Sequence, residues 1–127
     1  MIWPTPHYSK TQVNKAGRLL IEDPQDGNQY LQFLWAFDVV NNWRSCHSYP
    51  VNTFQATLRQ KLKSVDKNAI VAQRLKRMPS IMAKLKREKG MQLARMQDIG
   101  GLRAVVSTLG QVRSLETNYR SSINLHK

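Results

Sequence analysis

The chain has 127 residues, of which 41% are apolar, and it carries a formal net charge of +12. This length fits one small domain or a piece of one, and the apolar content is enough for a core. A single cysteine, Cys46, excludes an internal disulfide and a cysteine zinc cluster. No apolar run approaches the roughly 20 residues that cross a bilayer, and the first residues lack the layout of a signal peptide. We therefore expect a cytoplasmic protein with no membrane partner.

The positive charge is concentrated in the second part of the chain. Residues 1–56 hold four basic and four acidic side chains, whereas residues 57–127 hold sixteen basic and four acidic ones. A field of this sign attracts nucleic acid, nucleotide phosphates or an acidic membrane face, and charge alone does not choose among these partners.

Residues 1–65 are predicted to form a helical N-terminal segment. Residues 9–12 read Ser-Lys-Thr-Gln, the pattern of a capping box, which predicts a helix over 10–21. A second helix, ending near Trp43, is apolar on nearly every face, as is typical of a buried helix. Asn52 is predicted to cap a third helix that carries an apolar stripe.

The pattern changes after Asp66, and residues 66–127 are predicted to alternate between strands and helices. Residues 69–76 resemble a strand, Pro79 and Ser80 open a short helix over 81–87, and Gly90 ends it. Residues 101–107 are predicted to be a buried strand, followed by a helix over about 109–123. A helical segment followed by the order β-α-β-α predicts an α/β or α+β fold.

Several donors in this second part could converge on a phosphate chain. Arg74 and Lys76 leave one face of the predicted strand, and Lys84 and Arg87 share a face of the following helix. The N-terminus of that helix, at Ser80, offers free backbone N–H groups that favour anions.

Asp98, at the edge of the next predicted strand, could bind Mg²⁺ beside such phosphates, because Mg²⁺ takes one or two carboxylates together with phosphate oxygens. Taken one at a time, these residues also fit plainer interpretations: a solvated basic face, a helix cap and a turn. The pattern of residue types leaves both interpretations open.

The order of the residues favours the first interpretation. Arg74-x-Lys76-x-x-x-Ser80-Ile81-x-x-Lys84-Leu85-x-Arg87, followed by Asp98-Ile99-Gly100-Gly101-Leu102-Arg103, resembles the two linked motifs of RelA/SpoT-family synthetase domains. The match is firm over about 66–107, softer over 43–65 and weak elsewhere. Residues 66–127 are thus similar to the N-terminal half of such a domain.

The resemblance implies a fold, a cofactor and a set of roles. The fold would be a helical lead-in followed by the first part of a nucleotidyltransferase-like mixed sheet. Mg²⁺ would be the cofactor and ATP the pyrophosphate donor. Asp98 would bind the metal, and Arg103 would assist nucleotide binding as the second catalytic residue. ATP would be bound by five residues: Arg74, Lys76, Ser80, Lys84 and Arg87.

The implied activity is that of a GTP pyrophosphokinase, which transfers pyrophosphate from ATP to the 3′-hydroxyl of GDP or GTP and makes the guanosine tetra- and pentaphosphates of the stringent response. Family domains continue with a glutamate metal ligand and an acceptor pocket, whereas Glu116 and Tyr119 stand here in no family motif. We therefore expect only the ATP- and magnesium-binding half. Two alternatives remain: a toxin of the same family that modifies the 3′ end of tRNA, and a non-catalytic fragment that binds nucleotide or RNA.

Overall fold

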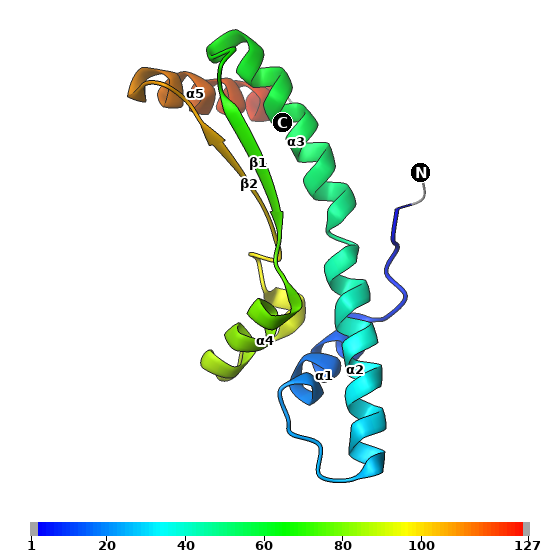
Figure 1. Cartoon of the computed structure of the whole chain (residues 1–127). Coiled ribbons are helices and arrows are strands. Elements are labelled where there is room, and N and C mark those ends of the chain that lie inside the picture. The colour runs from blue at the N-terminus through cyan, green and yellow to red at the C-terminus, as the bar shows by residue number, and fades with distance from the viewer. Residues whose placement is uncertain (1–2, 126–127) are drawn as a thin grey trace. The chain divides into compact units, whose positions relative to one another are not determined.

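The computed structural model describes the backbone of residues 3–125 and the side chains of residues 3–121. This part of the chain is mixed α+β and mostly helical, which confirms the broad class predicted from the sequence. Two strands form an antiparallel sheet. No helix in the described part is long and apolar enough to span a membrane. The elements in chain order are α1 (Lys10–Leu20), α2 (Gly27–Ser45), α3 (Ser48–Val65), β1 (Ile70–Leu75), α4 (Met78–Arg87), the 3-10 helix η1 (Leu93–Arg95), β2 (Gly100–Val105) and α5 (Leu109–Leu125) (Figure 1).

The chain divides into two compact units, and each unit draws on both sides of the predicted boundary between residues 65 and 66. The first unit comprises Met1–Pro50 and Leu75–Gly101, and the second comprises Val51–Arg74 and Leu102–Lys127. The chain passes from one unit to the other within α3, within β1 and within β2.

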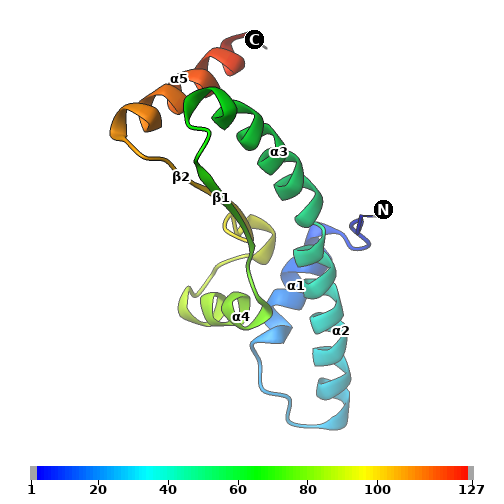
Figure 2. The ribbon, with the colours of Figure 1, turned by 45° about the horizontal axis from the view of Figure 1, so that its top comes forward.

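The core of the first unit is built by α1, α2, α4 and the segment that follows α4. Apolar side chains of these elements are withdrawn from water, and Ala16, Val39, Ile81 and Ile99 show no exposure at all. Burial of such side chains is the main favourable contribution to folding. Figure 2 shows α1 lying against α2, as the extensive contact between these helices requires.

The start of α1 is as predicted. The Ser9 hydroxyl accepts a 3.1 Å hydrogen bond from the Gln12 backbone N–H, and the Gln12 side chain accepts a 3.0 Å bond from the Ser9 backbone N–H. These two bonds form the capping box, which satisfies donors that the first turn of a helix leaves free. The predicted start of the third helix is wrong: α3 begins at Ser48, so Asn52 lies within the helix instead of capping it.

Two predictions of burial are also wrong. Helix α2 buries only Ala36, Val39 and Val40, whereas Tyr30 and Leu31 are 53% and 65% exposed. The main neighbour of α2 in this unit is α1, so the residues that face α1 are buried while other faces of α2 remain exposed. Strand β2 belongs to a sheet of two strands, and Val105 is 53% exposed where the sequence predicted a buried strand.

The second unit is held together by a carboxylate at the end of α3. Asp66 is nearly buried and accepts hydrogen bonds from the Asn68 backbone N–H at 2.9 Å and from the Ser107 hydroxyl at 2.9 Å. These bonds, that of Asn68 above all, hold the pKa of Asp66 below its ordinary value. Earlier in α3, the Lys61 ammonium donates a 2.6 Å hydrogen bond to the Asn118 side chain. Helix α5 therefore lies beside the C-terminal part of α3 (Figure 1).

Candidate functional site

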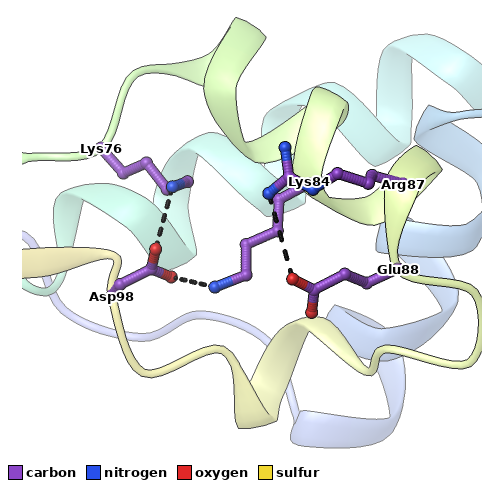
Figure 3. A network of polar contacts seen from close by, with 5 residues as sticks. All are labelled: Lys76, Lys84, Arg87, Glu88 and Asp98. Atoms are coloured by element: carbon purple, nitrogen blue, oxygen red, sulfur yellow. Dashed lines mark hydrogen bonds and ion pairs between the residues drawn. The ribbon is translucent and has the colours of Figure 1, made fainter.

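The two linked motifs meet at the carboxylate of Asp98. The Lys76 ammonium lies 3.0 Å from Oδ2 of Asp98, and the Lys84 ammonium lies 2.9 Å from Oδ1. Figure 3 shows the two lysines reaching this carboxylate from separate segments of the chain. Lys76 is 22 residues and Lys84 14 residues from Asp98 in the sequence, so tertiary folding creates this cluster. We call Lys76, Lys84 and Asp98 the lysine–aspartate cluster.

Backbone pairing places Lys76 in the cluster. Lys76 follows the last residue of β1, and its N–H donates a 2.6 Å bond to the Ile99 carbonyl just before β2. This bond extends the pairing of the two strands by one step and sets Lys76 beside Asp98. The Lys76 carbonyl in turn accepts a 2.6 Å bond from Nε of Arg44 on α2, so the backbone at this position is held from two sides.

Packing of α4 places Lys84. Ile81 and Leu85 are 0% and 5% exposed and fix the helix on the core of the first unit. Lys84 lies between them in sequence, and its side chain is only 18% exposed although its ammonium reaches a carboxylate. Lysine commonly buries its aliphatic stem in this way while keeping the charged head near polar groups.

The segment from α4 to Asp98 is held on the core at several points. Gly90 ends the turn after α4 with φ of 84°, a conformation that L side chains rarely adopt. The Ala94 N–H then donates a 2.8 Å bond to the Asn14 side chain of α1. Leu93 and Ile99 are 1% and 0% exposed. Asp98 therefore stands on a segment that is fixed immediately before and after it.

The two lysines set the charge state of Asp98. Hydrogen bonds from Lys84 and then Lys76 lower its pKa to about 2, so the carboxylate is ionised at neutral pH. Its side chain is 50% exposed, whereas the Lys76 side chain is 13% exposed. Ion pairs that reach solvent contribute about 0–1 kcal/mol each, so another anion can displace the carboxylate from the lysines at small cost.

Helix α4 begins earlier in the chain than the sequence predicted. The helix starts at Met78 with Arg77 at the N-cap, and no side chain caps it within the described residues. Ser80 therefore lies in the first turn and does not open the helix. The Ile81 N–H is bonded to the Arg77 carbonyl at 3.0 Å, whereas the N–H groups of Met78 and Ser80 belong to the set that a helix leaves without an internal partner. Such groups and the helix dipole favour a bound anion.

The remaining predicted residues do not join the lysine–aspartate cluster. The Arg87 guanidinium lies 3.9 Å from the neighbouring Glu88 carboxylate, as Figure 3 shows, and it is 68% exposed. Arg74 lies on β1 and Arg103 on β2, both exposed and both within the second unit. Of the seven predicted residues, ion pairing thus unites Lys76, Lys84 and Asp98.

Asp98 has the chemistry of a magnesium ligand, although it stands alone. Among the described residues no group of three His, Cys, Asp or Glu side chains could hold a metal ion. Mg²⁺ nevertheless often takes a single carboxylate and completes its shell with water and substrate phosphates. Each carboxylate oxygen has two lone pairs, so bonds to the lysines leave capacity for a cation. The residues present fit an ion that phosphates help to hold.

Arg44 holds the backbone at Lys76 through a hydrogen bond that the sequence did not reveal. It acts through the Lys76 carbonyl from 32 residues away, and no spacing rule connects positions so distant. In the sequence it is one arginine in the last turn of a helix, where a positive charge suits the helix dipole in any case.

A scan against protein-family models gives no match, and a search of curated proteins gives none.

Proposed function

We propose that this chain binds Mg²⁺·ATP at the lysine–aspartate cluster. We further propose that it does so as part of a RelA/SpoT-type pyrophosphokinase that transfers pyrophosphate from ATP to the 3′-hydroxyl of GDP or GTP. The observation that carries the proposal is the convergence of Lys76 and Lys84 on Asp98 at 3.0 and 2.9 Å. In the motifs that the sequence resembles, two of these positions are lysines that bind phosphate, and the third is the aspartate that binds the metal.

The environment of the cluster supports binding of a polyphosphate. Two ammonium groups and the free N–H groups of the first turn of α4 belong to the same unit, and both favour anions. The carboxylate among them is ionised and half-exposed, which suits a cation delivered together with phosphates. ATP without magnesium would attract the two lysines but would be repelled by the carboxylate. In the magnesium complex the phosphates can pair with the lysines and the cation can pair with the carboxylate.

The residues would exchange partners on binding. Lys76 and Lys84 would turn from Asp98 to phosphate oxygens, and Asp98 would hold the cation. Bound Mg²⁺ supplies neutralisation of the negative charge on the β- and γ-phosphates. In the transfer, the acceptor 3′-hydroxyl loses its proton to solvent and its oxygen bonds to the β-phosphorus, while the bond from that phosphorus to the bridging α–β oxygen breaks and AMP leaves. The chain's own part is to hold the phosphates in place and stabilise their charge, which is most of what phosphoryl-type catalysis requires.

The fold proposal follows the same resemblance. We propose that the β1–β2 pair is the first part of a nucleotidyltransferase-like mixed sheet and that Arg74 and Arg103, on adjacent strands, assist nucleotide binding there. We also propose that the protein acts in the cytoplasm, where its nucleotide substrates are found.

The charge of the chain favours a second acceptor. A net charge of +12 attracts polyanions, and the 3′ end of tRNA also presents a hydroxyl group. A third reading needs no transfer: a single carboxylate and two lysines are enough to bind a nucleotide without turning it over.

Calorimetric titration with ATP, with and without Mg²⁺, tests the binding step. We expect weak binding that Mg²⁺ strengthens, and the absence of heat at millimolar ATP from folded protein would overturn the proposal. Transfer is tested with γ-labelled ATP and GDP, GTP or tRNA as acceptors. Label on a guanosine product supports the pyrophosphokinase, label on tRNA supports the toxin reading, and binding without transfer supports the non-catalytic one.

A further inference from the structure

The first unit contains a cavity whose lining includes none of the residues of the lysine–aspartate cluster. Its volume is about 450 Å³, within the range of roughly 300–1,000 Å³ that is usual for small-molecule sites. It is lined by α1, by the C-terminal half of α4 and by the segment after α4. Gly17 of α1 and Gly90 of the turn after α4 both contribute to its wall.

The wall is apolar where the elements meet. Ile21, Leu85 and Met91 line it, and Leu85 is only 5% exposed. A Cβ at Gly17 would lie 3.1 Å from the Cβ of Leu93, so the glycine lets α1 pack closely against the segment after α4 at this wall. A purely polar ligand would gain nothing from this surface.

The rim is cationic and unpaired. Arg18, Lys86 and Lys89 line the cavity, and all three are exposed. Within the described residues no carboxylate lies within ion-pair distance of any of them. The nearest acidic residue in sequence, Glu88, faces Arg87. Three cations gathered on one rim without counter-charge favour a ligand that carries negative charge.

We propose that this cavity binds a small organic acid with an apolar body, whose anionic group lies among Arg18, Lys86 and Lys89 and whose apolar part lies against Ile21, Leu85 and Met91. The charge of the rim selects the anion, and the apolar wall selects the body. Neither feature depends on the proposed ATP site, since none of the residues of the lysine–aspartate cluster lines the cavity.

Octanoate is a suitable probe, with octanol and acetate as matched controls that each lack one half of the ligand. The readout is the amide NMR spectrum, because glycine signals are readily recognised and only Gly17 and Gly90 of the six glycines line the cavity. We expect octanoate to shift these two signals saturably and to leave that of Gly27 unchanged. Equal shifts with octanol or with acetate would overturn the proposed ligand class.

Variants separate this site from adventitious binding. Lys86→Gln with Lys89→Gln should weaken octanoate binding about fivefold, as expected for exposed charges. Lys10→Gln with Arg95→Gln removes the same charge from exposed positions outside the cavity and should have no such effect. Equal weakening in both double variants, or shifts confined to exposed Leu31 and Leu34 of α2, would overturn the proposal. Asp98→Asn should bind octanoate as the unaltered protein does, which keeps this test independent of the ATP site.

Discussion

The Lys84 ammonium forms an ion pair with the Asp98 carboxylate at 2.9 Å, across 14 residues of sequence. In the motif that the sequence resembles, the corresponding lysine binds phosphate. In the free protein this proposed phosphate-binding group is therefore paired with the proposed metal ligand. The two ammonium groups and one carboxylate leave the cluster with a net charge of +1, which favours a further anion.

Replacing Lys84 with Met should weaken Mg²⁺·ATP binding by about 1–3 kcal/mol, the range for losing a charge-assisted hydrogen bond. Methionine retains an apolar stem of similar length, so the packing between Ile81 and Leu85 is preserved. Calorimetry measures the change, and Lys10→Met, which removes an exposed lysine of α1, serves as the control. Equal losses in the two variants would indicate a diffuse charge effect in place of a site.

Replacing Asp98 with Asn should remove most of the effect of magnesium on ATP binding. The neutral amide no longer holds Lys76 and Lys84, so we expect metal-free ATP to bind more tightly than it does to the unaltered protein. Magnesium should then give little further gain, because the amide attracts a cation far less than a carboxylate does. Titrations of the variant with ATP, with and without Mg²⁺, test both expectations. A variant that retains the full magnesium effect would show that Asp98 is not the ligand.

The pairing of Asp98 should depend on pH in a defined direction. Its folded pKa is about 2, below the roughly 3.9 of an unpaired aspartate. A lowered pKa contributes stability that is fully present above about pH 4 and is lost as the pH falls toward 2. Carboxyl NMR titration of Asp98 should find this low value. Lys84→Met should raise it, since Lys84 makes the largest contribution; an unchanged pKa would contradict the pairing.

Arg44 should influence nucleotide binding without touching the nucleotide. Arg44→Met removes the 2.6 Å bond to the Lys76 carbonyl and frees the backbone that sets the Lys76 side chain. We expect ATP affinity to fall by about 0.5–1.5 kcal/mol, the usual net worth of one hydrogen bond. The position of the Lys76 amide signal reports the change directly. Arg18→Met, outside the cluster, is the comparison, and equal effects of both variants would remove Arg44 from a positioning role.

Local patterns determined much of the secondary structure. The capping box at Ser9 and Gln12 fixed the start of α1, and Gly90 marked the end of α4, because both features act through backbone groups within a few residues. The strands predicted over 69–76 and 101–107 correspond to β1 and β2, and the order of the predicted elements indicated the mixed α+β class. The order of basic residues and Asp98 was enough to nominate the candidate site as a set.

Tertiary structure decided which side chains are buried and which of the predicted site residues come together. The sequence could not tell that α2 leaves Leu31 exposed, because exposure depends on which neighbours cover a helix. It could not tell that Lys76 and Lys84 would meet at Asp98 while Arg87 faces Glu88, because those distances arise only when β1, α4 and the segment before β2 pack together. The contact of Arg44 with Lys76 and the cavity beside Gly17 also depend on residues that are distant in sequence. Local sequence sets backbone conformation, whereas contacts between distant residues exist only in the folded chain.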